Sequence, residues 1–165
     1  MATPQENRNG NPILVTGSSY RSGTTWAGRM LAYAPGVAYI HEPFNDAHVR
    51  RGINPKPFNC HFKCIRDENV EGFDAVFVDI LRYKYSLLAE CSNIHSFSLK
   101  DAARLIRGYA KCARFSMGRY RPLVKDPTAF YSAEWLAQRL NMQVVVLIRH
   151  SCGVHFKFED HVLEL

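Results

Sequence analysis

The stretch PILVTGSSYRSGTTW, residues 12–26, decides how this chain is interpreted. Its first part, Pro12–Thr16, is a short apolar run that predicts a buried strand. The run Gly17–Gly23 is small and polar, which predicts a loop. From Thr24 to Ala34 apolar side chains recur at helical spacing, which predicts a helix. The sequence therefore predicts a strand, a loop and a helix in direct succession.

Further apolar patterns continue this alternation along the chain. We predict strands at Val37–Ile40, Pro122–Lys125 and Val144–Ile148, and helices at Phe73–Cys91, Leu99–Phe115 (capped by Ser98) and Ser132–Leu140. The last strand is five consecutive β-formers, typical of a parallel strand buried on both faces. The alternation favours an α/β fold with three layers, α/β/α, around a parallel sheet. We expect one domain over residues 12–150, preceded by a polar, disordered leader at residues 1–11.

The chemistry of the loop points to an anion. Small residues let the backbone curl so that successive N–H groups point inward, and the helix that follows adds its own unpaired N–H groups and positive dipole end. Arg21 supplies a fixed charge that forks onto phosphate or sulfate oxygens. Ser22, Thr24 and Thr25 supply hydroxyl groups.

The loop departs from the Walker A pattern of phosphate-loop NTPases, Gly-x-x-x-x-Gly-Lys-[Ser/Thr]. Its glycines are one residue further apart, and Thr24 stands in the place of the lysine. A kinase-like enzyme, which would also need ligands for Mg²⁺, stays open as an alternative. A plain strand–turn–helix junction, with glycines needed only for geometry, is the other alternative.

The run Arg21-Ser22-Gly23-Thr24-Thr25-Trp26 after an apolar strand resembles the 5′-phosphosulfate-binding loop of the sulfotransferase family, especially its carbohydrate-type and bacterial members. Those enzymes move a sulfuryl group from 3′-phosphoadenosine-5′-phosphosulfate (PAPS) to a hydroxyl or amine on a small molecule or carbohydrate. The resemblance implies a P-loop NTPase-like fold without a metal. It also implies that residues 21–25 hold the 5′-phosphosulfate and that Trp26 lies near the adenine.

Three more residues extend the resemblance. Arg149 ends the strand Val144–Ile148, where the family begins its 3′-phosphate site; the alternative is a surface arginine. Glu42, in Glu42-Pro43 after the second strand, resembles the family's catalytic base; the alternative is a capping or solvated carboxylate, and His41 is a weaker candidate base. Lys125, in Lys125-Asp126-Pro127, faces either the donor or acceptor, or forms a surface salt-bridging pair.

Composition sets outer limits. The net charge is +6, from 21 basic and 15 acidic residues, which suits anionic ligands. The basic residues are scattered, with Arg50–Arg51 the only adjacent pair, so we expect no basic stripe and no nucleic-acid partner. No apolar run is long enough to span a membrane, and the five cysteines form no paired framework, so we expect a cytoplasmic setting. Cys60-His61-x-x-Cys64 lacks partners at zinc-site spacing, so we expect no metal.

The segment 151–165 departs from the family. Relatives continue after the strand-ending arginine as His-Pro-Ala-Ala-x-x-Ser-Ser-Leu-Lys, with a serine at the eighth place, where this chain has Lys157. With suitable wobble bases, a shift by one nucleotide near codon 151 makes the tail spell Pro-Ala-Ala-Phe-Thr-Ser-Ser-Leu-Lys. We therefore interpret 151–165 as an aberrant tail on a partial domain and hypothesise a frameshift, which the coding DNA tests. An inactive, donor-binding fragment is the corresponding alternative function.

Overall fold

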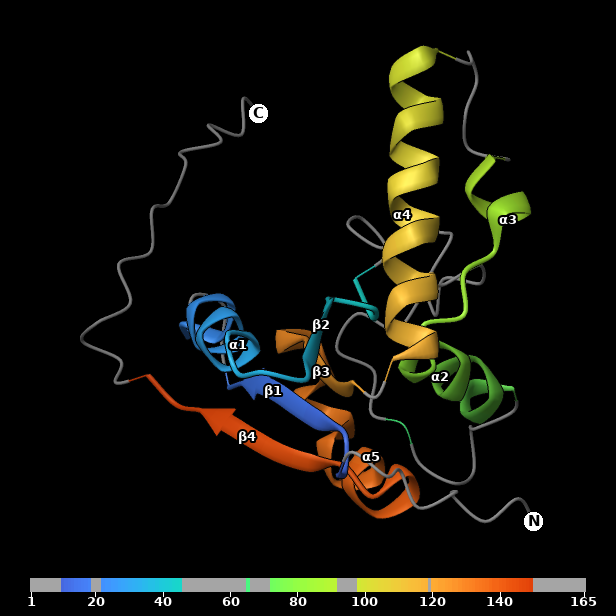
Figure 1. Ribbon diagram of the computed structural model, residues 1–165. Coiled ribbons are helices and arrows are strands. Elements are labelled where there is room, and N and C mark those ends of the chain that lie inside the picture. The colour runs from blue at the N-terminus through green and yellow to red at the C-terminus, as the bar shows by residue number, and fades with distance from the viewer. Residues whose placement is uncertain are drawn as a thin grey trace, which may run out of the picture.

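Four strands form one parallel sheet in the computed structural model, which describes residues 10–18, 22–45, 65, 72–91, 98–118 and 120–149 (Figure 1). They are β1 (Ile13–Gly17), β2 (Val37–His41), β3 (Arg121–Lys125) and β4 (Gln143–Leu147), in the spatial order β2-β3-β1-β4. Every neighbouring pair is parallel. The predicted α/β fold with a parallel sheet is confirmed.

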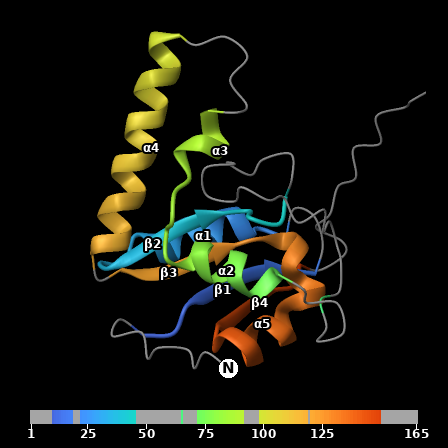
Figure 2. The same cartoon turned by 90° about the vertical axis from the view of Figure 1, so that its right-hand side faces the viewer.

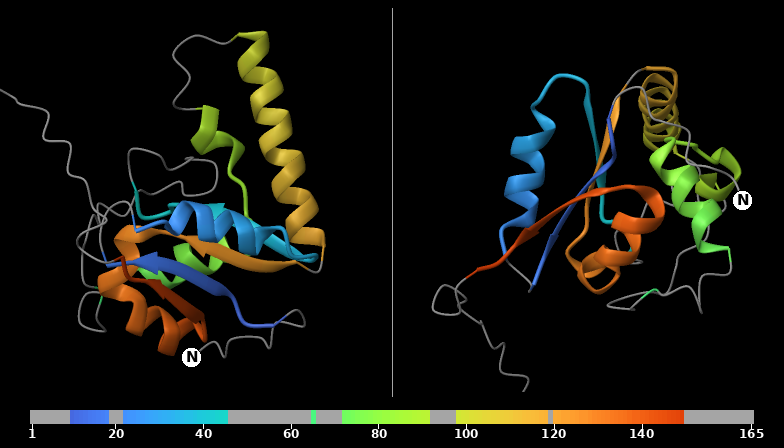
Figure 3. Two further views of the ribbon diagram at one scale, coloured as in Figure 1. Left: turned by 90° about the vertical axis from the view of Figure 1, so that its left-hand side faces the viewer. Right: turned by 90° about the horizontal axis from the view of Figure 1, so that it is seen from below.

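Two crossovers leave the centre of the sheet in opposite directions. From β1 the chain runs through α1 (Thr24–Ala32) to β2, beyond β3. From β3 it runs through the 3₁₀ turn η2 (Pro127–Ser132) and α5 (Ala133–Leu140) to β4, beyond β1. Since parallel crossovers are right-handed, opposite directions place the helices on opposite faces, as Figure 3 shows for α1 and α5. In such sheets the carboxyl ends of the strands at the reversal, here β1 and β3, border the ligand-binding crevice.

An aromatic cluster fills the core on the α5 side of the sheet. Phe73 and Phe77 belong to α2 (Phe73–Leu81), and their ring centroids lie 5.8 Å apart. Phe44, just after β2, lies 5.5 Å from Phe73, and Trp135 of α5 meets Phe73 edge-on at 5.7 Å. These buried rings hold the loop after β2 against α2 and α5, and so fix that end of the sheet.

The helix predicted over Phe73–Cys91 is wrong, because the chain forms two helices, α2 and α3 (Leu87–Cys91). Between them Tyr83 takes a left-handed conformation with φ 56° and donates its hydroxyl hydrogen bond to the carbonyl of Ala38 in β2. That buried contact competes with helix continuation and turns the chain. Leu88 of α3 is 86% exposed.

Helix α4 (Leu99–Met117) confirms its prediction and projects away from the sheet (Figures 1 and 2). Ser98 caps it as expected: its hydroxyl accepts from the N–H of Asp101, whose carboxylate accepts from the N–H of Ser98. Leu105 is buried on its packing face, whereas the neighbouring Ile106 is 68% exposed.

Strand β4 exists where it was predicted, but the expectation that it is buried on both faces is wrong. Val145 and Val146 are 40% and 42% exposed. The reason is its place at the edge of the sheet: among the described residues, β4 pairs only with β1. A run of β-formers reports strand propensity and not the number of neighbours that the strand acquires.

Candidate functional site

The N-terminus of α1 follows the carboxyl end of β1, and the residue before its first turn is a glycine. Gly23, the N-cap residue, has a left-handed conformation, φ 89°, and no side chain with which to cap the first turn. That turn carries no acidic residue. The first N–H groups of α1 have no partner within the helix, and together with the positive end of the helix dipole they form the kind of terminus that binds anions.

Ser22 supplies a second, independent sign of a ligand at this point. Its hydroxyl oxygen is buried and has no hydrogen-bond partner among the described residues. Most buried polar atoms in proteins are paired, and an unpaired one costs about 1–3 kcal/mol. Ser22 lies so close over β1 that a Cβ on Gly17 would stand 2.0 Å from its Oγ. Gly17 thus makes room for a hydroxyl that an oxyanion would satisfy.

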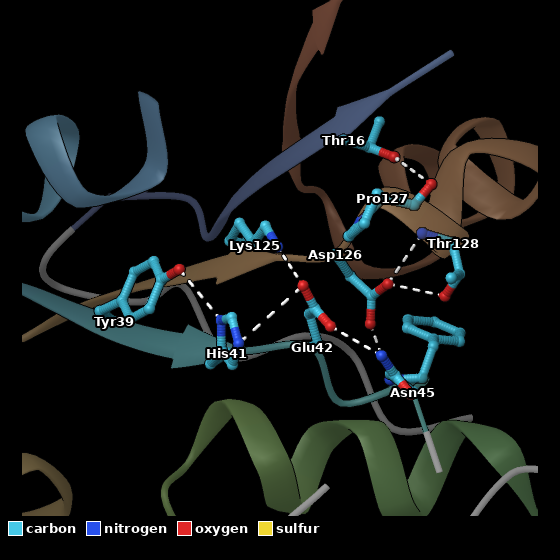
Figure 4. A network of polar contacts seen from close by, with 10 residues as sticks. Thr16, Tyr39, His41, Glu42, Asn45, Lys125, Asp126, Pro127 and Thr128 are labelled. Atoms are coloured by element: carbon cyan, nitrogen blue, oxygen red, sulfur yellow. Dashed lines mark hydrogen bonds and ion pairs between the residues drawn. The ribbon is translucent and has the colours of Figure 1, made fainter. Parts of the chain in front are cut away.

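A buried ion pair stands at the ends of the two neighbouring strands (Figure 4). Lys125 ends β3 and is 2% exposed; Glu42 follows β2 and is 8% exposed. Lys125 Nζ donates to Glu42 Oε1, and the N–H of Glu42 donates to the carbonyl of Lys125 at 2.8 Å. Asn45 Nδ2 donates to the other carboxylate oxygen, Oε2, at 2.8 Å.

The net effect on Glu42 keeps its carboxyl ionised. Burial alone would raise the pKa of Glu42, but the hydrogen bonds from Lys125 and Asn45 and the charges of Lys125 and His41 outweigh it, so that the pKa lies below its usual value. Glu42 also holds a left-handed backbone conformation, φ 43°, which is uncommon for a non-glycine residue. Such strain gathers at functional sites, where surrounding contacts retain it.

Asp126 has a structural part beside this pair. It is fully buried and accepts hydrogen bonds from the N–H of Phe44 at 2.7 Å and from the N–H and hydroxyl of Thr128 at 2.9 and 2.7 Å. Burial raises its pKa, against the effect of these bonds and with a smaller contribution from the charge of Glu42. Lys125 therefore does not form the surface pair that the sequence left open: its partner is Glu42, and all three side chains are buried.

Helix α1 packs directly on the lysine. A Cβ placed on Gly28 would lie 3.1 Å from Cβ and Cγ of Lys125 and from the ring of Tyr39. Tyr39 in turn makes a hydrogen bond with Nδ1 of His41 at 3.2 Å, and His41 Nε2 lies 3.9 Å from Glu42 Oε1. The close approach at Gly28 thus sets α1 against the β2–β3 side of the sheet, where the ion pair lies.

The remaining predicted residues gather at the same edge as far as they are described. Thr24 is buried, whereas Thr25 and Trp26 are exposed on the first turn of α1. Arg149 is exposed two residues beyond β4, whose last residue pairs with Gly17 and accepts from the N–H of Ser18. Arg21 and the Cys60–Cys64 motif lie outside the described residues.

The Lys125–Glu42 pair was not predicted, although the sequence carries a signal for it. Each residue stands at the carboxyl end of a predicted strand, and carboxyl ends of parallel strands meet at one edge. The sequence did not give the spatial order of strands, which places β2 beside β3. Among the described residues no group of three or more histidine, cysteine and acidic side chains could hold a metal ion.

Comparison of the chain with protein-family models, curated proteins and solved structures found no match. No helix within the described part of the chain has the length and hydropathy needed to cross a membrane. The case for a function therefore depends on the geometry above and on the loop sequence.

Proposed function

We propose that this chain is a sulfotransferase domain that takes a sulfuryl group from PAPS and delivers it to an acceptor hydroxyl or amine. The observation that carries the proposal is the buried hydroxyl of Ser22, which has no partner among the described residues and lies at the N-terminus of α1, where Gly23 offers no side-chain cap. It favours an oxyanion ligand at the loop whose sequence resembles the phosphosulfate loop.

The donor would be held along the carboxyl edge of a P-loop NTPase-like sheet. Backbone N–H groups of residues 22–25, with the hydroxyl of Ser22 and the guanidinium of Arg21, are assigned to the 5′-phosphosulfate. Trp26, 71% exposed, leaves an aromatic face free for the adenine. Arg149 is exposed two residues beyond the end of β4 and is assigned to the 3′-phosphate.

The reaction is an in-line attack on sulfur. A bond forms between the acceptor oxygen or nitrogen and sulfur, the bond from sulfur to the 5′-phosphate oxygen breaks, and the acceptor proton passes to the carboxylate of Glu42. Arg21 and the loop N–H groups stabilise the charge that grows on the leaving phosphate. Lys125 keeps Glu42 ionised, as a proton acceptor must be, and no step requires a metal.

The proposal is tested by titrating the donor product, 3′-phosphoadenosine-5′-phosphate (PAP), into the wild-type chain and into Arg21→Ala. Losing a charge-assisted contact to phosphate weakens binding by about 1.5–3 kcal/mol, roughly ten- to a hundredfold. Arg29→Ala is the matched control, because Arg29 is exposed at the other end of α1.

Saturable PAP binding that Arg21→Ala weakens, Arg29→Ala preserves and ATP with Mg²⁺ fails to displace supports the proposal. Tighter binding of Mg²⁺–ATP than of PAP contradicts it and favours a kinase-like enzyme. If the chain binds PAP but transfers no sulfuryl group from PAPS to any acceptor in a panel of sugars, phenols and amines, it is an inactive donor-binding fragment.

A further inference from the structure

Helix α4 carries two exposed stripes that the proposed function does not use. Its buried residues, Leu105, Gly108 and Cys112, are three and four positions apart and form one packing face. Tyr85 lies against that face, since a Cβ on Gly108 would meet its hydroxyl at 2.9 Å. Most residues on the other sides of the helix are exposed, and the helix projects from the sheet (Figure 2).

The first stripe is basic. Its members recur at intervals of four and three residues, so they share one face of the helix, and all are exposed: Lys100, Arg104, Arg107, Lys111 and Arg114. The only acidic residue of α4 is Asp101, which holds the N-terminal capping box and whose Oδ1 lies 3.5 Å from Nη2 of Arg104. The expectation that the basic residues form no stripe is therefore wrong for this helix, because helical periodicity gathers charges that are scattered in sequence.

The second stripe is apolar and lies beside the first. It is made of the residues that directly precede each basic one and of Met117, all exposed except the half-buried Ala113: Leu99, Ala103, Ile106, Ala110, Ala113 and Met117. Leu99, Ile106 and Met117 are 92%, 68% and 83% exposed. Successive residues are about 100° apart around a helix, so the order around α4 is apolar, basic, buried. The apolar stripe thus points nearly opposite to the packing face.

We propose that α4 binds an anionic lipid surface, lying along it with the apolar stripe at the level of the acyl chains and the basic stripe among the headgroups. A helix with bulky apolar residues on one side and lysine and arginine beside them has the pattern of interfacial helices. Its 19 residues offer a contact about 28 Å long.

The apolar stripe distinguishes this partner from other anions. A nucleic acid or a sulfated polysaccharide would pair with the five cations but would leave Leu99, Ile106 and Met117 exposed to water. A lipid interface accepts both stripes at once, because long basic side chains extend their charges to the headgroups while apolar neighbours insert. The packing face then looks away from the membrane, so binding requires no unfolding of α4.

Flotation of the full chain with phosphatidylcholine vesicles, with and without phosphatidylserine, tests the proposal. We expect binding to the phosphatidylserine vesicles that falls as salt rises. Each basic residue contributes about fivefold, so the triple variant Arg104→Gln/Arg107→Gln/Lys111→Gln should bind roughly a hundredfold more weakly. The matched control, Arg29→Gln/Arg82→Gln/Lys84→Gln, removes the same net charge from exposed positions on other segments and should lose far less.

The apolar stripe is tested by Ile106→Ser/Met117→Ser, with Leu88→Ser on α3 as the control for an exposed apolar residue. We expect the α4 variant alone to weaken vesicle binding, at low and high salt. Equal losses in the two charge variants, an unchanged Ile106→Ser/Met117→Ser variant, or stronger capture by short duplex DNA or heparin than by vesicles would overturn the proposal. All the replaced residues are exposed, so we expect each variant to fold. A circular dichroism melt checks this.

Discussion

Replacing Lys125 by Met removes the charge of the buried pair and keeps the aliphatic stem on which Gly28 packs. Glu42 then stays buried with no lysine beside it. Removing one partner of a buried pair costs about 3–5 kcal/mol, because the other charge is left uncompensated. The loss of stability has an upper limit here, because Glu42 can take up a proton and so avoid being a buried, unpaired charge. At pH 7 protonation costs about 3 kcal/mol for a carboxyl with the ordinary pKa of 4.5. We therefore expect the free energy of unfolding to fall by about 3 kcal/mol.

The difference in stability between the wild type and Lys125→Met should depend on pH. In the wild type the pKa of Glu42 is lowered by folding, so its stabilisation is present above pH 4.5 and is lost as the pH falls through the lower, folded value. In Lys125→Met the main remaining influence is burial, which raises the pKa. The penalty is then largest at neutral pH and shrinks on acidification toward pH 4.5. The difference in stability between the two proteins should therefore narrow as the pH falls.

Urea unfolding followed by the fluorescence of the buried Trp135 measures this difference at several pH values. Lys84→Met is the matched control: it breaks an exposed pair with Asp79, 2.8 Å long, and should cost less than about 1 kcal/mol. The double variant Lys125→Met/Glu42→Gln should recover much of the lost stability. A Lys125→Met variant as stable as the wild type, or a loss that does not change with pH, would refute the view that the pair is buried and holds Glu42 ionised.

Three further predictions concern the loop, the α4 cap and the core. Gly17→Ala places a Cβ 2.0 Å from the Ser22 hydroxyl, so the PAP affinity measured by calorimetric titration should fall at least tenfold, whereas Arg29→Ala should leave it unchanged; equal affinities would show that Ser22 is not part of the donor site. Ser98→Ala removes the capping box and should destabilise α4 by about 1 kcal/mol in hydrogen exchange, and no change would show that the helix end is fixed elsewhere. Phe77→Ala empties the centre of the core and should cost about 3–5 kcal/mol in urea unfolding; a loss below 1 kcal/mol would mean that the site refills.

The strands and helix starts were predictable because their signals are local. The apolar run before Gly17 gives β1, and Ser98 with the acidic residue three positions later marks the start of α4. Both signals act within one turn or strand, so no knowledge of neighbours was needed. The parallel sheet followed from the alternation of elements.

What could not be predicted depends on contacts between distant segments. Tyr83 breaks the expected helix because its hydroxyl reaches the carbonyl of Ala38, 45 residues earlier in the chain. Val145 is half exposed because the strand order places β4 at the edge of the described sheet. The Lys125–Glu42 pair likewise needs β2 beside β3, an order that periodicity does not encode.

The central claim, that the N-terminus of α1 binds the phosphosulfate end of a PAPS-like nucleotide, is tested most directly by an amide NMR titration of the ¹⁵N-labelled chain with PAP. We predict that the largest chemical-shift changes fall on the amides of residues 22–25. They should saturate with the PAP affinity that a calorimetric titration of the same chain gives. Mg²⁺–ATP at equal concentration should shift them less. If PAP leaves these amides unchanged in a folded sample, or shifts a different part of the chain, the loop is not the donor site and the proposed function fails.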